Sequence, residues 1–536
     1  MNGRWQPWLA TYREHGIPAD IDPDALPSVV ALMEAAMQRF ADRTAFRAHG
    51  STLTYADVDR QSAAFAAWLQ NALGVRPGAR IGLMLPNSLA FPIACLGILR
   101  AGAVQVNINP LYTARELEHQ LTDAGVTAIV VCDTALPVLM GVLDRTAIAH
   151  VIVDGRAPAD GAMTVTFADA VLAGAAWVYA PVPLTGADIL FLQYTGGTSG
   201  VSKGAVLTHR NLLANIAQFK AISPDALRAG AEVIVTAIPL YHIFALMVNF
   251  LAYFSIGAEN WLVDNPRDLD GFIDVLQQAR PTVFVGVNTL YAGLLAHPRL
   301  RTVDFTRLRL SIGGGAAVVK VVSDQWLALT GTFIREGYGL TETSPVLTFN
   351  PAAVQSFTGS TGLPMPGTDI VLRDDNGRDA APGTPGEICA SGPQVMSGYW
   401  RQPEATARAF TPDGYFRTGD IGVFDAAGFL SIVDRKKDIV IVSGFNVYPN
   451  EVEAVASACA GVAECACTGM PDARTGEALV LFIVRRPDAT LDAGAVIAHC
   501  RTALTAYKVP KTVRFVDALP KSTVGKILRR ELRQLA

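Results

Sequence analysis

The residues best suited to chemistry in this 536-residue chain stand together in one stretch, Tyr194–Ala205, with the sequence YTGGTSGVSKGA. Glycines permit backbone conformations in which several N–H groups point at one anion. Threonine and serine hydroxyls can donate to phosphate oxygens, and Lys203 adds a positive charge. The stretch therefore predicts a phosphate-binding loop, although a flexible surface loop rich in turn-forming residues would have a similar composition.

This phosphate-binding loop differs from two common nucleotide motifs. Lys203 is followed by Gly204 and Ala205, so the GK[ST] ending of a Walker loop is missing, and the GxGxxG pattern is absent from the stretch. An apolar run at Ile189–Gln193 predicts a strand before the loop, and Thr208 is a suitable N-cap for an amphipathic helix after it. We therefore expect the loop to lie between a strand and a helix.

Two further stretches combine glycine with polar or aromatic side chains. SIGGGAA, at Ser311–Ala317, would let the backbone lie close to a flat ligand. GYGLTETS, at Gly337–Ser344, offers an aromatic ring at Tyr338, a hydroxyl at Thr341 and a carboxylate at Glu342. By itself the second stretch fits equally well a strand and turn with a buried tyrosine and an exposed glutamate.

The C-terminal part of the chain carries two more polar motifs. Asp413–Lys437, DGYFRTGDIGVFDAAGFLSIVDRKK, places Asp420 upstream of Arg435, and a carboxylate can accept hydrogen bonds from two hydroxyls at once. Leu519–Leu532, LPKSTVGKILRREL, places Lys526 directly after a glycine. A TGD sequence alone is a common turn. Only the presence of Arg435 downstream favours a binding role for Asp420.

Taken in their order along the chain, these five stretches resemble those of the acyl-adenylate-forming (AMP-binding) enzymes, and more narrowly those of the bacterial long-chain fatty-acid–CoA ligases. The resemblance runs from about Leu26 to the C-terminus. It implies that a fatty-acid carboxylate attacks the α-phosphate of ATP, that pyrophosphate leaves, and that the acyl-adenylate then reacts with CoA and releases AMP. ATP, Mg²⁺ and CoA are therefore the expected cofactor and co-substrates.

The resemblance also assigns a role to each motif residue. Tyr338 would stack on adenine, Asp420 and Arg435 would bind the ribose, and Thr341 would reach the α-phosphate. Glu342 would hold Mg²⁺, and Lys526 would reach the α-phosphate and the substrate carboxylate. Lys526, Glu342 and Thr341 are thus the expected catalytic residues. The expected ATP- and AMP-binding residues are Thr195, Gly196, Gly197, Thr198, Ser199, Gly200, Lys203, Gly313, Gly314, Gly315, Tyr338, Gly339, Thr341, Asp420, Arg435 and Lys526.

The acyl-binding residues implied by the resemblance are His242, Val287, Asn288 and Gly313. His242 is expected to gate the acyl site, although a lone histidine in an apolar sequence is more often a core residue. Some long-chain relatives carry a gating tryptophan near Leu246, which this chain lacks, so the acyl chain length stays open.

For the second half-reaction, the resemblance implies CoA-binding residues at Ser443, Gly444 and Phe445 and a hinge at Lys437. An ordinary β-turn and an ordinary solvated lysine are the alternatives for these two places. The other basic residues around Lys526 are expected to lie in solvent; they are Lys521, Arg529 and Arg530.

The elements that must position these residues alternate in type. Short β-rich runs at 79–86, 126–132, 232–239 and 281–287 are each followed by a helical pattern, which predicts an α/β fold with mostly parallel sheets. We expect a large, layered N-terminal domain at residues 1–435, which binds nucleotide and acyl group. A small, mobile α+β domain is expected at residues 436–536.

Composition narrows the class of protein further. The net charge of −4 creates no general attraction for nucleic acid or an anionic membrane. The seven cysteines form no CxxC pair, and the N-terminus has no apolar signal region, so we expect reduced thiols in a cytoplasmic protein. Pro239–Ala258 is about long enough to span a membrane, but a buried strand end and core helix explain it better. Peripheral contact with the inner face of the membrane and a homodimer stay open.

Two functions other than a CoA ligase are also compatible with these motifs. One is an acyl-adenylate former that passes its product to a free carrier protein, and the other is a non-catalytic fatty-acid-binding relative. The glycine-bearing loop at Ser443 favours CoA, and the joint presence of Lys526, Glu342, Asp420 and Arg435 favours an enzyme.

Overall fold

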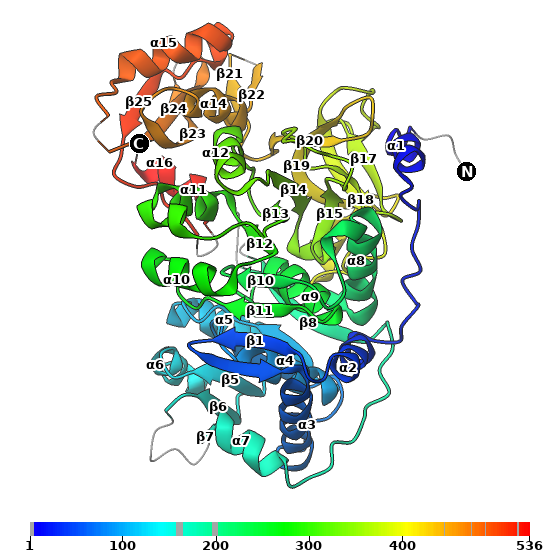
Figure 1. Ribbon diagram of the computed structural model, residues 1–536. Coiled ribbons are helices and arrows are strands. Elements are labelled where there is room, and N and C mark those ends of the chain that lie inside the picture. Colours follow the sequence, from blue (N-terminus) through cyan, green and yellow to red (C-terminus); the bar gives the residue numbers. More distant parts are fainter. Residues whose placement is uncertain are drawn as a thin grey trace.

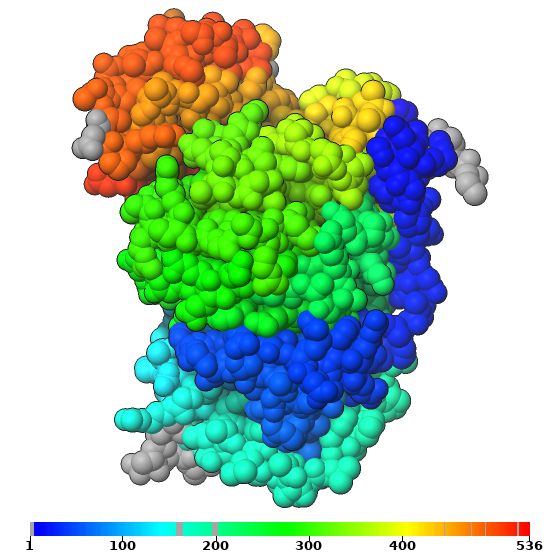
Figure 2. Space-filling model, viewed as in Figure 1, coloured from blue at the N-terminus to red at the C-terminus, as the bar shows by residue number. Residues whose placement is uncertain are grey.

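The computed structural model describes residues 5–156, 164–195, 202–443, 445–472, 474–487, 489–522 and 525–535. Within these ranges the chain has the predicted α/β class: sheets of mostly parallel strands, covered by helices, form a large N-terminal region. A smaller α+β part, drawn in orange and red, packs at one end of that region (Figures 1 and 2).

One large sheet carries the strands that lead to the glycine-rich motifs. Its described strands follow the spatial order β16 (Leu363–Pro364), β15 (Val346–Phe349), β14 (Ile334–Gly339), β13 (Leu310–Gly313), β12 (Val283–Gly286), β10 (Val233–Thr236), β11 (Glu259–Leu262), β1 (Thr44–Ala48) and β2 (Ser51–Thr54). The strands from β14 to β1 pair in parallel, and antiparallel strands close both edges. The runs predicted at 232–239 and 281–287 form two central strands, β10 and β12.

A second sheet leads to the phosphate-binding loop. Its described strands follow the order β7 (Thr164–Thr166), β6 (His150–Asp154), β5 (Ala128–Cys132), β3 (Arg80–Met84), β4 (Val104–Asn107), β8 (Ile189–Thr195) and β9 (Lys203–Thr208). All pairs are parallel except β8 with β9. Strands β3 and β5 occupy the runs predicted at 79–86 and 126–132.

Helices cover the faces of these sheets, as the crossover connections of parallel strands require. They are α1 (Trp8–His15), α2 (Val29–Arg39), α3 (Tyr55–Asn71), α4 (Ala90–Arg100), α5 (Ala114–Ala124), α6 (Leu136–Met140), α7 (Phe167–Gly174), α8 (His209–Ile222), α9 (Tyr253–Ser255), α10 (Leu269–Ala279), α11 (Asn288–Ala296), α12 (Lys320–Thr330) and α13 (Pro403–Ala409). Thr54, Thr113 and Thr208 begin α3, α5 and α8 with capping boxes, each worth about 1 kcal/mol.

The apolar segment Pro239–Ala258 lies in the protein core. It contains a π-helix, η3 (Ala245–Ala252), whose residues are all buried. The side-chain amide of Asn260 donates to the Asn249 carbonyl at 2.9 Å, and Asn249 donates to the Thr236 hydroxyl at 3.1 Å. These hydrogen bonds connect the π-helix to strands β10 and β11.

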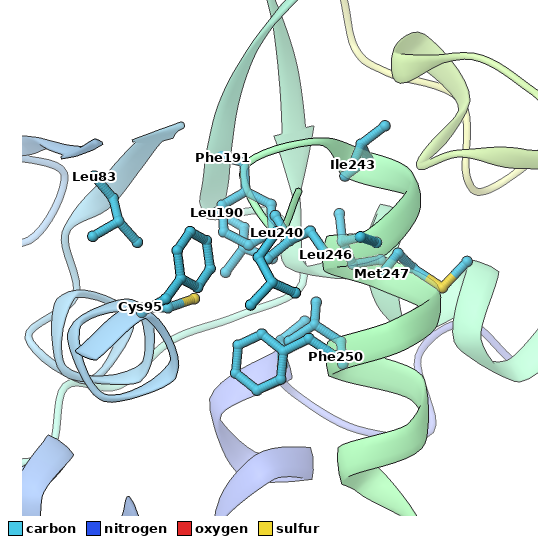
Figure 3. Packing of buried hydrophobic residues seen from close by; sticks show 14 of the residues in the cluster. Leu83, Cys95, Leu190, Phe191, Leu240, Ile243, Leu246, Met247 and Phe250 are labelled. Atoms are coloured by element: carbon cyan, nitrogen blue, oxygen red, sulfur yellow. The ribbon is translucent and has the colours of Figure 1, made fainter. Parts of the chain in front are cut away.

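Figure 3 shows what this helix packs against. Leu246 and Phe250 of the π-helix face Phe191 of β8 and Cys95 of α4, so the helix fills the space between the two sheets. Among the residues that the structure describes, no helix combines the length and the apolar composition needed to cross a membrane.

The remaining strands form two smaller sheets. The antiparallel order β17 (Asp369–Arg373), β18 (Gly386–Ser391), β19 (Phe416–Phe424) and β20 (Leu430–Arg435) ends at the expected domain boundary. The C-terminal part contains β21 (Val440–Val442), β22 (Phe445–Val447), α14 (Pro449–Ser457), β23 (Val462–Asp472), β24 (Gly476–Arg485), α15 (Ala493–Ala503), β25 (Thr512–Phe515) and α16 (Arg529–Leu535). It has an apolar core of its own. The division between residues 435 and 436 stays a prediction.

Candidate active site

A cavity that is partly open to solvent lies at the carboxyl ends of β13 and β14. Open α/β sheets bind ligands at such ends. The cavity brings together sequence positions that were predicted separately. Its lining residues are Phe219, His242, Ile243, Phe244, Val248, Ile312, Gly313, Gly314, Gly315, Gly337, Tyr338, Gly339, Leu340, Thr341, Pro345, Val346, Phe349 and Lys526.

The glycines of the lining allow close packing at the strand ends. A Cβ atom on Gly314 would lie 2.9 Å from Cζ of Phe244, and one on Gly339 would lie 1.9 Å from the Pro345 carbonyl oxygen. A larger residue at Gly339 would therefore push the backbone apart. The first three residues of SIGGGAA belong to strand β13, which ends at Gly313.

Tyr338, Asp420 and Arg435 form one polar cluster beside the cavity. Asp420 and Arg435 stand opposite each other in the antiparallel pair β19–β20, and the Arg435 Nε lies 3.2 Å from Asp420 Oδ1. The Tyr338 hydroxyl donates to Asp420 Oδ2 at 2.6 Å. Burial raises the pKa of the Tyr338 phenol well above its usual range, so it stays a hydrogen-bond donor.

Glu342 lies in a 3₁₀ turn, Thr341–Thr343, and is almost fully buried. The Tyr399 hydroxyl donates to Glu342 Oε1 at 2.8 Å, and the ammonium of Lys203 lies 5.1 Å above the Tyr399 ring. Burial raises the pKa of Glu342, while this hydrogen bond and the charges of Arg435 and Lys526 act in the opposite direction. Tyr399 was not predicted as a site residue, because nothing in the sequence GYWR marks it.

Lys526 enters the cavity from the C-terminal part of the chain. The preceding glycine packs against the start of α11, where an added Cβ on Gly525 would lie 2.3 Å from Thr289 Oγ1 and 3.5 Å from Val287. Burial and the positive charge of Arg435 lower the pKa of Lys526, whereas Asp420 and Glu342 raise it. The basic helix α16 begins three residues after Lys526, at Arg529.

His242 is buried in the cavity wall. The backbone N–H of Phe244 donates to His242 Nδ1 at 3.3 Å, so a neutral imidazole carries its proton on Nε2. Burial, together with the nearby Lys526 ammonium, lowers the pKa of His242 to about 3. The imidazole is therefore uncharged at physiological pH, which suits a gate or a hydrogen-bond donor better than a general acid.

The apolar side of the cavity comes largely from residues that sequence motifs did not mark. Phe219 of α8 packs edge-to-face on Phe349 of β15, with ring centroids 5.2 Å apart, and Phe244 and Val248 complete this wall. The face that a long helix such as α8 turns toward a ligand follows from tertiary packing, so Phe219 gave no local signal.

Two predicted acyl-binding residues stand outside the cavity lining. Val287 packs behind the Lys526 segment, and the Asn288 side-chain oxygen accepts the Val319 N–H at 2.9 Å. Asn288 thereby fixes the segment that follows SIGGGAA. The acyl-binding role of both residues stays a prediction.

The phosphate-binding loop is only partly described, because Gly196, Gly197, Thr198, Ser199 and Gly200 lie outside the described residues. Its two ends are Thr195 on β8 and Lys203 on β9, which stand opposite each other in an antiparallel pair. The expected strand-to-helix connection is therefore wrong in detail, since a strand intervenes and α8 begins only after Thr208.

Among the predicted CoA and hinge residues, Ser443, Phe445 and Lys437 are absent from the described cavity lining. Gly444 is outside the described residues. Ser443 has a left-handed backbone with φ of 52°, and the exposed Phe445 ring stacks on Tyr507 at 4.7 Å. Lys437 is exposed between β20 and β21. These roles stay predictions.

Known proteins resemble the chain over almost its whole length. The sequence pattern of the AMP-binding enzyme family matches residues 33–400, and that of the AMP-binding enzyme C-terminal domain matches residues 451–526. A long-chain-fatty-acid–CoA ligase of Salmonella typhimurium is 47% identical, covering 99% of this chain and 98% of that protein.

Solved structures give the same result. The anthranilate CoA ligase AuaEII in complex with anthranoyl-AMP has a TM-score of 0.89 at 26% identity and covers 96% of this chain and 99% of its own. ATP-bound MatB from Rhodopseudomonas palustris has a TM-score of 0.84 at 32% identity and covers 94% of this chain and 98% of its own. The chain belongs to the AMP-binding enzyme family.

Proposed function

We propose that this protein is an ATP-dependent fatty-acid–CoA ligase, which makes acyl-CoA, AMP and pyrophosphate through an acyl-adenylate. The observation that best supports this proposal is that one cavity is lined by both the Lys526 ammonium and an apolar wall, beside the Tyr338–Asp420–Arg435 cluster. An acid–thiol ligase of this class must bring an anionic phosphate and an apolar acid into one space. The similarity to the Salmonella ligase supports the same function.

In the adenylating step, two anions must approach each other in line. Lys526 supplies a positive charge between the α-phosphate and the carboxylate, and the Thr341 hydroxyl donates to the same phosphate. Tyr338 and the backbone of Gly313–Gly315 hold the adenine. Asp420 accepts the ribose hydroxyls in addition to the Tyr338 hydroxyl, because a carboxylate has about four acceptor positions. Thr195, Lys203 and the loop between them hold the phosphates.

Glu342 fits a magnesium ion bound mainly by phosphate oxygens. In the described part of the chain, no cluster of three or more ligating side chains could hold a metal by itself. Mg²⁺ prefers exactly such sites, with one or two carboxylates plus substrate phosphates and water. One Glu342 oxygen accepts the Tyr399 hydroxyl, which leaves the other oxygen for the ion. The ion would supply charge neutralisation at the phosphates.

The acyl group lies along the wall formed by Phe219, Phe244, Val248 and Phe349. His242 donates from Nε2 to a carboxylate oxygen at the entrance, and Gly313 lies beside it. Burial of each CH₂ of the substrate contributes about 0.8 kcal/mol, so aliphatic chains are preferred to acetate.

Thioester formation uses the C-terminal domain, residues 436–536, in a second position. Rotation at Lys437 removes Lys526 and brings Ser443, Gly444 and Phe445 to the path of CoA. The exposure of Phe445 in the present arrangement supports this proposal, since an apolar ring in solvent gains from burial elsewhere. A homodimer and peripheral membrane contact remain predictions of the sequence.

The test is CoA-dependent AMP formation with saturated acids of graded length, with acetate and anthranilate as comparisons. We expect the highest rates with medium or long aliphatic acids. A preference for anthranilate or acetate would refute the substrate class. Fatty-acid-dependent exchange of pyrophosphate into ATP without acyl-CoA production would instead favour transfer to a free carrier protein. Failure of the exchange itself would favour the non-catalytic relative.

A further inference from the structure

Arg529 and Arg530 are adjacent and look alike in the sequence, but the structure separates them. Arg530 is exposed, as expected for both residues. The Arg529 side chain is only 17% exposed and lies among acidic groups, so its expected solvation is wrong. The two arginines therefore differ in exposure, and Arg529 has acidic contacts that the sequence does not indicate.

The guanidinium of Arg529 bridges elements on both sides of the expected hinge. Its Nη2 lies 2.8 Å from Glu453 Oε2 of α14, and its Nη1 lies 3.6 Å from Asp438 Oδ2 and 3.8 Å from Asp434 Oδ1. Asp438 and Glu453 belong to the C-terminal part, whereas Asp434 is a fully buried residue of β20.

Asp434 is itself a point of attachment between the two parts. Its Oδ2 accepts the backbone N–H of Asn450 at 2.9 Å, and its Oδ1 accepts the backbone N–H of Arg435 at 2.7 Å. Asn450 also binds Arg529. The side chain of Arg435 in turn pairs with Asp420 at the cavity. A continuous polar network therefore joins Arg529 to the ribose side of the site.

The side chain of Lys526, three residues before Arg529, lies in surroundings that disfavour its charged form. Burial and the charge of Arg435 both lower its pKa, which means that entry of the ammonium into the cavity costs free energy. An attachment close to Lys526 must offset this cost. The Arg529 network is placed to do so, because it fixes the start of α16 directly after the Lys526 segment.

We propose that Arg529 is a positioning residue, which links α14 and the start of α16 to Asp434 and thereby holds Lys526 in the cavity for adenylation. The inference rests on the proposed function. Arginine suits the task because its planar fork can serve several acceptors at once, which a lysine ammonium does with less directional control.

The experiment compares Arg529→Gln with the matched control Arg530→Gln in the full chain. Fatty-acid-dependent exchange of pyrophosphate into ATP measures adenylation, and acyl-CoA formation from supplied acyl-adenylate measures the second step. We expect Arg529→Gln to lower the kcat of exchange by about 10²-fold, as expected for a displaced catalytic group. The KM for ATP and the second step should change little, and Arg529→Lys should be intermediate. Arg530→Gln should match the wild type in both steps.

Asp434→Asn distinguishes positioning from stability of the C-terminal part, because it leaves the Arg529–Glu453 pair intact. We expect the same selective loss of exchange, with a thermal midpoint close to the wild-type value. Equal exchange in Arg529→Gln and Arg530→Gln would overturn the inference. So would a parallel loss of both half-reactions together with early unfolding in both Arg529→Gln and Asp434→Asn. Absence of exchange in the wild-type protein would overturn the proposed function as well.

Discussion

At the scale of single residues, burial affects the charge state of Lys526, which lines the cavity, and of Glu342, which follows the lining residue Thr341. Lys526 and Glu342 have pKa values shifted toward the neutral form by burial, and each is drawn back by its charged neighbours. Ionisable groups whose pKa values are shifted by burial and by nearby charges are common at functional sites. The two residues therefore invite separate tests.

Lys526→Ala is expected to abolish most of the adenylating activity. A single well-placed charge typically contributes about 10²–10³ in rate. Thioester formation from supplied acyl-adenylate should remain, because in the proposed mechanism Lys526 leaves the cavity before that step. Pyrophosphate exchange and single-turnover acyl-CoA formation measure the two steps. Exchange at the wild-type rate in this variant would remove Lys526 from the mechanism.

Glu342→Gln is expected to raise the Mg²⁺ concentration needed for half-maximal adenylation. The amide keeps the hydrogen bond from Tyr399 but lacks the negative charge that attracts the ion. A Mg²⁺ titration of the exchange reaction checks this, and Tyr399→Phe serves as the comparison that removes only the hydrogen bond. An unchanged titration in Glu342→Gln would show that the carboxylate is structural.

At the scale of elements, a buried carboxylate fixes the segment that follows SIGGGAA. Glu336 of β14 accepts the backbone N–H of Val318 at 2.8 Å, and burial raises the pKa of Glu336 from 4.5 to about 8. Between these two pH values, the Glu336 carboxyl group is ionised in the unfolded chain but stays protonated in the folded protein. Stability is therefore full below about pH 4.5 and falls as the pH rises to about 8.

Glu336→Gln should remove this loss, because glutamine keeps the acceptor for Val318 and cannot ionise. The free energy of unfolding that Glu336 contributes falls by up to about 1.4 kcal/mol per pH unit in this range. We expect the melting temperature of the variant, relative to wild type, to increase between about pH 5 and pH 8 and then stay constant. A difference independent of pH would mean that Glu336 does not titrate in this range.

The apolar wall makes a prediction about chain length. Phe219→Ala should shift the preferred substrate toward longer acids, because each further buried CH₂ is worth about 0.8 kcal/mol, or about fourfold in kcat/KM. Phe272→Ala is a matched control, since Phe272 is equally buried in the separate core around Phe284 and Trp326. Rates across graded acids check both variants. An equal shift in both, or in neither, would place the acyl chain elsewhere.

The local motifs could be read from the sequence because their glycines and polar residues stand next to one another on single strand ends. SIGGG and GYGLTE needed only the strands β13 and β14 to reach the cavity. Tyr399, Phe219 and Arg529 could not be found in this way. Their roles depend on partners tens to hundreds of residues away, and tertiary packing alone distinguishes Arg529 from Arg530.

At the scale of the whole molecule, several described contacts join the C-terminal part to the large N-terminal region. Lys526 and Gly525 insert next to α11, and Lys436 pairs with Glu387 at 3.1 Å beside the network around Asp434. In the proposed mechanism, the C-terminal part exchanges these contacts for others when it moves to its second position, with Lys437 as the hinge.

Lys437→Pro tests this alternation. Proline fixes φ near about −65° and removes the freedom that a rotation at this residue requires. We expect adenylation to persist, since Lys526 already lies in the cavity, and acyl-CoA production to fall strongly. Gly444→Trp should give the same pattern by blocking the path of CoA. Single-turnover assays follow the two steps separately. A parallel fall in both steps would indicate misfolding, and unchanged acyl-CoA production would show that the two half-reactions proceed without rotation at Lys437.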